Sequence, residues 1–383
     1  MKVSDDGIEL SGQADGRTAA DRSIAVSGSA GERSAADRSV TVSGGTGERM
    51  ADRSIAVSDV RVAVDLPDLD PVEMTARVFA PDGPEPGAPL LFCVPGMSYG
   101  KEYWDLPLDG YSFARAAAAA GHVVVAVDNV GTGESGRPAA ADAVTLAAMA
   151  GANAALAEEI QARLVAGDLV PDLGPLEPGR TVGIGHSLGG CLVLLQQAAS
   201  ATFAAIAVLG FSNQPLAGIY EDHEREAELT DAERFAWATE HLPPKLWGRP
   251  WEELEPYFEL PRENFGELFY APGTPAAVIA ADTALATTVP RTAAIETTIP
   301  RVSAAAAAAI DVPVLLAYGA TDLSPDPDAE PGTYPAAPSV ELLRLQGSAH
   351  CHNVSVDREL LWGRLLDWAA ETAASDGPGA AAR

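Results

Sequence analysis

The segment from Thr181 to Leu195 constrains the fold more than any other part of the chain. It reads Thr-Val-Gly-Ile-Gly-His-Ser-Leu-Gly-Gly-Cys-Leu-Val-Leu-Leu, so a short apolar strand passes through a tight turn at residues 185–189 directly into an apolar helix. Glycines flank the serine because larger side chains would clash with the neighbouring strand and helix. The turn points Ser187 outward at a helix N-terminus, where unpaired N–H groups and the helix dipole stabilise a developing negative charge. A nucleophilic serine requires this setting.

A second Gly-x-Ser-x-Gly match, around Ser98, is a competing position for such a serine. It also follows an apolar strand, residues 90–94. However, charged residues and Pro107 come after it, where a buried helix would have to begin. The sequence therefore favours Ser187 over Ser98 as the nucleophile.

Segments typical of strands and of helices alternate along most of the chain. Continuous apolar runs, such as residues 123–127 and 314–317, are typical of strands that helices cover on both faces. We therefore predict an α/β fold, with a mainly parallel twisted sheet between two layers of helices. The predicted strands are 59–64, 73–79, 89–94, 122–128, 181–186, 204–210, 312–318 and 340–345, and the predicted helices are 111–120, 142–166, 189–200 and 357–373.

The alternation stops between Phe211 and Ile310. This stretch contains helix signals, such as the capping pattern that begins at Thr230, and many aromatic residues. We predict a helical cap at residues 211–310, inserted into a core that comprises residues 51–210 and 311–374. The aromatic side chains are expected either to form the core of the cap or to line an apolar pocket.

One short phrase occurs three times near the N-terminus, at residues 20–27, 36–43 and 51–58. Copies this short cannot stack into a domain with its own core. Only the third copy continues into a predicted strand. We therefore predict a disordered, repeat-containing extension at residues 1–50, and a short tail at residues 375–383.

The composition limits the possible partners and the compartment. The chain has 54 acidic and 25 basic side chains and a formal net charge of −29, which argues against nucleic acid because phosphate binding needs a basic face. The acidic surface fits either high solubility or adaptation to high salt. The N-terminus lacks the apolar segment of a signal peptide, and no apolar run is long enough to span a bilayer. We therefore expect a cytoplasmic protein without a membrane partner, while no feature indicates an oligomeric state.

The three cysteines predict neither a disulfide framework nor a metal site. Cys93, Cys191 and Cys351 are an odd number without metal-ligand spacing, and each lies in an apolar stretch or beside a candidate site. We expect them to be buried free thiols.

A serine hydroxyl needs a base to remove its proton and a third group to orient that base. Two histidines, His350 and His352, lie in the polar loop after the last predicted strand. Both follow Ser187 in the chain, as the order serine, acid, histidine requires. Either one can therefore be the base.

The acid is expected in the loop that leaves the preceding strand, because sites in open α/β sheets gather at that edge. Asp322 lies three residues beyond Gly319, in the loop that follows the strand at residues 312–318, and is the favoured acid. Asp326 and Asp328 lie further along among prolines, where a solvated acidic loop is the simpler interpretation.

Attack on a carbonyl produces an oxyanion, which two converging N–H groups must stabilise. One is expected from Leu188, directly after the serine, and the other from Met97, in the loop after the strand at residues 90–94.

Taken together, these motifs resemble those of the α/β-hydrolase fold superfamily, over about residues 55–373. The resemblance adds the glycine three residues before His350, which favours His350 over His352 as the base. It also places Pro95-Gly96-Met97 where many members have His-Gly-x; the proline keeps the backbone donor but loosens assignment to lipases or carboxylesterases. Residues 128–135 are interpreted as a structural turn, not a phosphate loop, because their glycines do not lead into a capped helix.

The resemblance implies a serine hydrolase with no metal or organic cofactor. Its substrate would be a small, partly apolar molecule with an ester-like bond, which is a carboxylic ester, a thioester or a lactone. A serine at position 187 argues against epoxide hydrolase or haloalkane dehalogenase chemistry, which similar families perform with an aspartate there. The alternatives are a non-hydrolytic ligand-binding protein, or a lyase or acyltransferase with the same three residues.

Overall fold

The computed structural model describes residues 54–374, apart from 68, 86, 172, 177–179 and 218–228, and four short strands nearer the N-terminus. Those four are β1 (Lys2–Ser4), β2 (Gly7–Glu9), β3 (Ile24–Gly28) and β4 (Ser39–Val40). The rest of the predicted N-terminal extension and the predicted tail, residues 375–383, lie outside the described residues. Disorder of residues 1–50 therefore stays a prediction.

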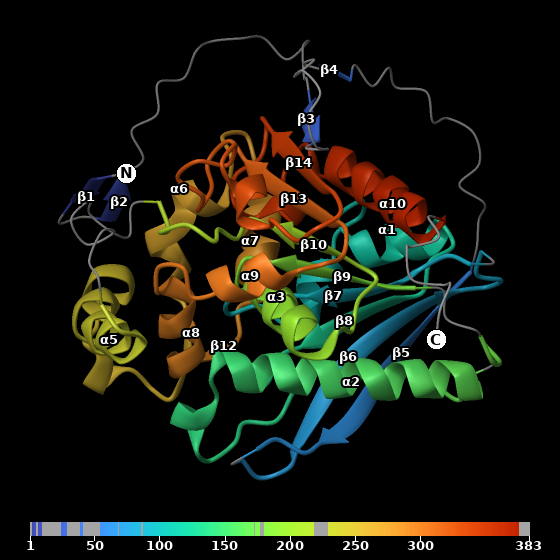
Figure 1. The fold of residues 1–383 in the computed structure, drawn as a ribbon, viewed down its shortest axis with the longest axis horizontal. Helices are drawn as coiled ribbons and strands as arrows, with labels where there is room; N and C mark the ends of the chain where they lie inside the picture. Colours follow the sequence, from blue (N-terminus) through green and yellow to red (C-terminus); the bar gives the residue numbers. More distant parts are fainter. Residues whose placement is uncertain are drawn as a thin grey trace.

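A twisted sheet forms the centre of the molecule (Figure 1). From one edge to the other, the strand order is β4, β3, β14, β13, β10, β9, β7, β8, β6, β5. All neighbours from β14 to β8 are parallel, whereas β3 pairs antiparallel with β14, and β6 pairs antiparallel with both β8 and β5. This confirms the mainly parallel sheet. The main strands are β5 (Ile55–Val64), β6 (Val72–Pro81), β7 (Leu90–Val94), β8 (Val124–Asp128), β9 (Thr181–His186), β10 (Ala205–Leu209), β13 (Val314–Gly319) and β14 (Val340–Leu345).

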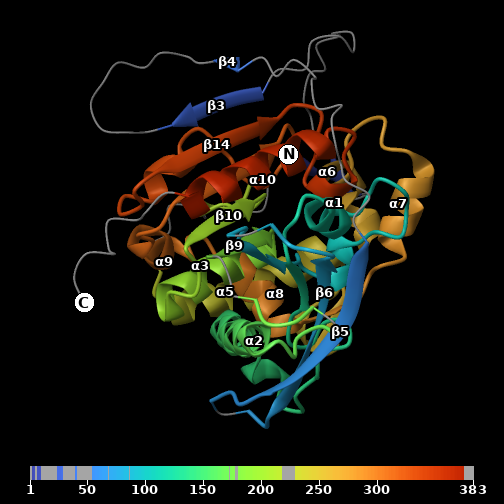
Figure 2. The same cartoon turned by 90° about the vertical axis from the view of Figure 1, so that its right-hand side faces the viewer.

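Helices cover both faces of the sheet, as predicted (Figure 2). On one face α1 (Phe113–Ala119) contacts α10 (Arg358–Ala374), and on the other α3 (Leu188–Ser200) contacts α2 (Leu146–Ala166) and α9 (Ala304–Ala309). Because of this double cover, every residue of β7, β8, β9, β10 and β13 is buried. The continuous apolar runs of the sequence are thus explained.

Most predicted boundaries agree with the structure within a few residues, and the late start of one helix has a local cause. The helix predicted at residues 142–166 begins at Leu146. Thr145 caps it, because its side chain accepts a hydrogen bond from the Ala148 N–H, and residues 141–143 form a separate 3₁₀ turn.

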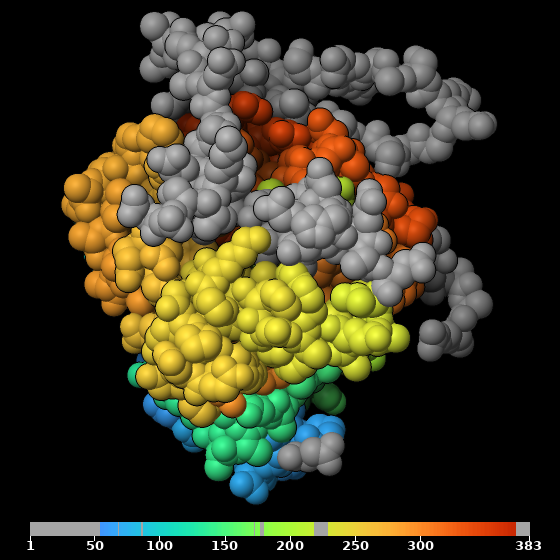
Figure 3. All heavy atoms as spheres, turned by 90° about the vertical axis from the view of Figure 1, so that its left-hand side faces the viewer, coloured from blue at the N-terminus to red at the C-terminus, as the bar shows by residue number. Residues whose placement is uncertain are grey.

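The segment predicted as a helical cap spreads over the side of the molecule that Figure 3 shows in yellow and orange. It contains α5 (Asp231–Trp247), α6 (Gly266–Phe269), α7 (Ala276–Thr283) and α8 (Arg291–Thr298). It also contains a two-stranded antiparallel sheet of β11 (Tyr257–Glu259) and β12 (Thr288–Pro290), which the sequence did not predict. The predicted capping box is present, since Thr230 and Glu233 bond each other's backbone N–H groups.

A buried ion pair fixes the loops that leave β7 and β8. The ammonium of Lys101 lies 2.7 Å from the Asp128 carboxylate, and both side chains are buried. Asp128 also accepts hydrogen bonds from the Thr75 hydroxyl and from the backbone N–H groups of Lys101 and Glu134. These contacts join the two loops to each other and to Thr75 on β6, which supports the interpretation of residues 128–135 as a structural turn.

We predict that Lys101→Met lowers the free energy of unfolding by about 3–5 kcal/mol, because it leaves the buried Asp128 carboxylate without its counter-charge. Urea denaturation followed by circular dichroism measures the change. The control is Arg163→Met, which removes a partly exposed pair with Glu159 and should cost less than about 1 kcal/mol. Equal losses in the two variants would contradict the structural role of Lys101.

Candidate active site

Ser187 lies in a strained turn between β9 and α3. Its φ is 54°, a left-handed conformation that side chains rarely adopt. The strain follows from close packing: a Cβ on Gly185 would lie 2.2 Å from the Gly189 carbonyl oxygen, and one on Gly189 would lie 2.2 Å from that of Val94. Only glycine fits at either position, so α3 begins directly against the ends of β7 and β9.

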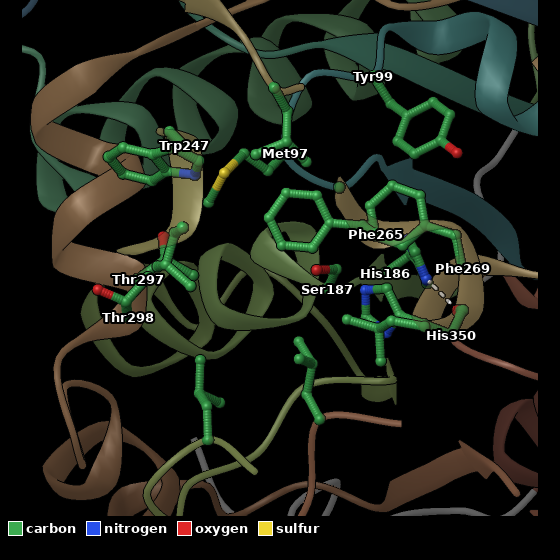
Figure 4. Close-up of a pocket in the computed structure, with 16 residues that line it drawn as sticks. Met97, Tyr99, His186, Ser187, Trp247, Phe265, Phe269, Thr297, Thr298 and His350 are labelled. Atoms are coloured by element: carbon green, nitrogen blue, oxygen red, sulfur yellow. Dashed lines mark hydrogen bonds between the residues drawn. The ribbon is translucent and has the colours of Figure 1, made fainter. Parts of the chain in front are cut away.

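The Ser187 side chain lines a cavity between the sheet and the segment that contains α5, α6, α7 and α8, which is called the inserted segment below (Figure 4). Its empty volume is about 630 Å³, including the open mouth. The polar lining is confined to a few residues near Ser187 and two threonines of α8. The lining residues are Gly96, Met97, Tyr99, His186, Ser187, Leu216, Leu246, Trp247, Leu260, Phe265, Leu268, Phe269, Thr297, Thr298, Leu323 and His350.

Asp322 and His350 are in direct contact. His350 Nδ1 lies 2.7 Å from Asp322 Oδ1, and both side chains are buried. The carboxylate also accepts hydrogen bonds from the backbone N–H groups of Gly319 and Leu323. Burial by itself would raise the pKa of Asp322, but the attraction and hydrogen bond of His350 and the hydrogen bond of His352 outweigh it and hold that pKa well below its usual range. The carboxyl group is therefore ionised at neutral pH.

His350 and Ser187 line the same cavity, although Ser187 precedes the inserted segment in the chain and His350 follows it. Because Nδ1 of His350 bonds Asp322, its Nε2 is the nitrogen available to a neighbouring hydroxyl. Among the described residues, no hydrogen bond joins the Ser187 hydroxyl to His350; such contacts are often long before substrate binds. Gly210, with φ of 64°, lies close to this pair: a Cβ there would approach His350 Nδ1 to 3.0 Å.

Met97 and Leu188 carry the predicted N–H donors. Leu188 is the first residue of α3, so its N–H has no partner within the helix. Met97 lines the cavity, and its neighbour Gly96 lies against the serine, since a Cβ on Gly96 would be 3.2 Å from Ser187 Cβ. Within the described part of the chain, neither N–H donates to a protein acceptor. Both are free to bind an oxygen in the cavity.

The structure places the other sequence candidates away from the cavity. The Ser98 hydroxyl is buried and accepts a hydrogen bond from the Leu260 N–H. Asp328 pairs with Arg344 at the surface, and the backbone of Asp326 bonds Gln214. His352 contacts Asp322 but does not line the cavity.

The inserted segment holds both loops that border the cavity. The backbone N–H groups of His350 and Cys351 donate to the carbonyls of Leu268 and Phe269, at α6. The loop that carries Met97 is held at its next residue, because the Ser98 carbonyl accepts from the Thr287 N–H. Sequence reasoning missed these contacts, since backbone hydrogen bonds between distant loops leave no residue signature.

A buried ion pair anchors the same segment. Arg262 Nη1 lies 2.9 Å from Asp282 Oδ2, and both side chains are buried. The hydroxyls of Tyr99 and Tyr270 also donate to Asp282, and the Arg262 guanidinium stacks on the Tyr99 ring at 3.9 Å. Tyr99 follows the Met97 loop, so this cluster joins that loop to α7.

His186 has a role that its variable position in the serine motif did not predict. Its Nε2 donates to the His350 carbonyl oxygen at 2.8 Å, its ring stacks on Tyr103, and its Nδ1 is buried without a partner. Burial first, and then the nearby His350 and His352, hold the pKa of His186 well below its usual value. His186 is therefore a neutral support for the His350 backbone.

The described residues contain no cluster of three or more His, Cys, Asp or Glu side chains arranged to hold a metal ion. No described helix is long and apolar enough to cross a membrane. The three cysteines are free and buried, as predicted.

The comparisons with known proteins agree with this architecture. The model of the alpha/beta hydrolase family matches residues 91–361, more than half of the chain. A search of curated proteins found no match.

Solved structures with a similar fold include proteins of different activities. The enol-lactonase from Burkholderia xenovorans LB400 is 14% identical, with a TM-score of 0.53, over 81% of this chain and 100% of that one. An esterase from Exiguobacterium antarcticum is 14% identical, with a TM-score of 0.51, over 81% and 100%. A haloalkane dehalogenase variant from Bradyrhizobium elkanii is 18% identical, with a TM-score of 0.51, over 83% and 98%. At these identities the likeness concerns the fold alone.

We predict that His186 makes stability depend on pH. The folded state disfavours the charged imidazole, whereas the unfolded chain binds a proton near pH 6.5. The contribution of neutral His186 to the free energy of unfolding is therefore complete above pH 6.5. It is lost as the pH falls, by up to about 1.4 kcal/mol per pH unit. His186→Gln keeps an Nε2 donor but cannot titrate, so its free energy of unfolding should fall less between pH 7.5 and pH 5.5. Identical pH dependence in urea titrations of both proteins would show that His186 is not held neutral.

Proposed function

The chain belongs to the alpha/beta hydrolase family, and from that premise we propose that it is a serine hydrolase acting on an ester-like bond. The substrate is a small, partly apolar carboxylic ester, thioester or lactone, and the reaction passes through an acyl-enzyme. The observation that carries the proposal is the buried Asp322–His350 hydrogen bond beside the cavity that Ser187 lines. It supplies an oriented base next to a strained serine.

In the proposed reaction, Ser187 Oγ attacks the carbonyl carbon while its proton passes to His350 Nε2. Asp322 holds the imidazole in the tautomer with the proton on Nδ1 and stabilises the imidazolium that forms. His350 then donates the proton to the leaving alcohol or thiol, and the acyl group stays on Ser187. A water molecule, deprotonated by His350, releases the acid and restores the serine.

The proposed oxyanion hole consists of the N–H groups of Met97 and Leu188. Neither donates to an acceptor among the described residues, and Leu188 also brings the positive end of the α3 dipole. Removing one such donor typically costs about 10²–10³ in rate. Because both donors are backbone groups, side-chain substitution at these positions does not delete them.

The cavity lining supports a neutral acyl or alcohol group. Among the residues that the structure describes, no Asp, Glu, Lys or Arg lines it. The hydroxyls of Thr297 and Thr298 donate to the carbonyls of Ala293 and Ile295 within α8, so they offer little to a ligand. A charged substituent would have to lose its hydration without a partner.

The serine distinguishes this reaction from that of the similar dehalogenase fold, since the family resemblance assigns an aspartate nucleophile to such enzymes. A binding protein, a lyase and an acyltransferase on the same fold are the alternatives, and the next experiment separates the binding protein from an enzyme.

We predict that Ser187→Ala lowers turnover of p-nitrophenyl acetate by about 10⁴-fold or more. It should also abolish labelling by a fluorophosphonate, which reacts with activated serines. The matched variant Ser98→Ala removes the serine of the competing motif and should keep labelling and most turnover. Wild-type protein that neither turns over esters nor takes the label would favour the binding protein, and labelling on Ser98 would refute the assignment.

We predict a strong preference for uncharged acyl groups. The p-nitrophenyl esters of butyrate and of succinate have similar chain lengths, but the second carries a carboxylate that the apolar cavity cannot pair. The kcat/KM for the butyrate ester should be higher by about 100-fold, equivalent to about 2.7 kcal/mol of desolvation. Equal kcat/KM values would mean that the substrate does not enter this cavity.

A further inference from the structure

Asp322 contacts a second imidazole besides that of His350. His352 Nε2 lies 2.9 Å from Asp322 Oδ2, while His350 Nδ1 lies 2.7 Å from Oδ1. Each carboxylate oxygen therefore accepts one imidazole N–H and, in addition, one backbone N–H, from Gly319 or Leu323. Nothing in the proposed reaction uses the His352 contact.

The surroundings of His352 require a neutral ring. The side chain is completely buried and does not line the cavity, and its Nδ1 has no hydrogen-bond partner within the part of the chain that the structure describes. Since the carboxylate can only accept, the proton must lie on Nε2. A second proton, on Nδ1, would be an unsatisfied buried donor and would place a positive charge beside His350.

The backbone of this segment does not depend on the His352 ring. Neighbouring Asn353 bonds the Tyr103 carbonyl and accepts from the Trp362 indole. Cys351 donates from its backbone to the Phe269 carbonyl. The loop is thus held on both sides of His352, which leaves the imidazole–carboxylate contact as the distinctive feature of this side chain.

We propose that His352 is a positioning residue for the proposed reaction: its neutral imidazole donates to Asp322, fixes the carboxylate for His350, and draws off part of its negative charge. The inference rests on the proposed function, since it assigns Asp322 and His350 as acid and base. It also explains two histidines in one loop, of which one faces the substrate and the other faces the acid.

The charge balance around Asp322 supports this division of roles. Among the described residues, one carboxylate faces three imidazoles, and His186, on β9, is held neutral by burial. From the 3₁₀ helix η1 (Lys101–Trp104), Tyr103 stays protonated because burial raises its pKa well above the usual value, and the same holds for Cys351. From the insertion, Asp282 and Arg262 pair with each other. Among these described groups, the charge that balances Asp322 in the proposed reaction is the proton that His350 takes up.

The sign of the effect on pH dependence follows from this arrangement. Without the His352 N–H, the negative charge of Asp322 is less dispersed and attracts the proton on His350 more strongly. The base is then protonated at higher pH, so the acid limb of the kcat/KM profile moves upward. The strength of a hydrogen bond to a charged group sets an upper limit of about one to two pH units on this movement.

The test compares His352→Gln, His352→Asn and His352→Phe in p-nitrophenyl acetate hydrolysis across pH. Gln can place an amide N–H where Nε2 lies, whereas Asn is too short and Phe has no donor. Asn and Phe should lower kcat by about 10- to 100-fold, leave KM within about threefold, and raise the acid limb, while Gln restores most of both. His122→Gln, which changes a buried histidine bonded to Pro89, should leave kcat and the acid limb unchanged.

Several results would overturn the proposal. Equal effects of Gln and Asn would indicate packing alone, and an unmoved acid limb in active Asn or Phe variants would remove the charge argument. A dead His352→Gln with an active His350→Gln would reverse the roles of the two histidines.

A measurement that needs no turnover separates this proposal from the proposed function. Nitrogen NMR of histidine-labelled protein at pH 7.5 should show the ring proton of His352 on Nε2. A proton on Nδ1 contradicts the proposal even if the protein hydrolyses no ester. Failure of Ser187 to take a fluorophosphonate contradicts the proposed function instead.

Discussion

The geometry of the whole cavity depends on how closely α3 approaches the strands that precede it. Gly185 and Gly189 leave no space for a Cβ, because each would collide with a backbone carbonyl. This contact forces Ser187 into a left-handed conformation and aims the start of α3 at the cavity. Three features follow from the one constraint: an exposed hydroxyl, a free N–H at Leu188, and the favourable helix dipole beside them.

The second organising feature is the buried Asp322 carboxylate, which accepts hydrogen bonds from backbone and from two imidazoles. Asp322 receives backbone N–H groups, His350 and His352, and this set outweighs the cost of burying its charge. The inserted segment contributes backbone contacts to the site rather than catalytic side chains, because the carbonyls of α6 accept hydrogen bonds from the backbone of the His350 loop. We therefore regard the insertion as part of the site and not only as its cover.

The sequence predicted those features that local patterns encode. Strand-to-helix alternation gave the parallel sheet, and the glycines around Ser187 gave its strained turn. Asp322 and His350 were predicted by chain order and position at the sheet edge, and the structure brings them together, although their catalytic roles stay a proposal. The sequence could not predict the β11–β12 pair, the support that His186 gives to the backbone of His350, or the contact of His352 with Asp322. These depend on which oxygen or nitrogen faces which neighbour, and residues far apart in the chain decide that.

The proposed function requires that Ser187 is the residue that takes the acyl group. Rapid mixing with p-nitrophenyl acetate, acid quenching and intact mass measurement test this directly. If Ser187 is the nucleophile, the mass of the chain increases by that of one acetyl group, and peptide mapping finds this group on Ser187. An unmodified chain during active turnover, or an acetyl group mapped to Ser98 or to any other residue, would contradict it.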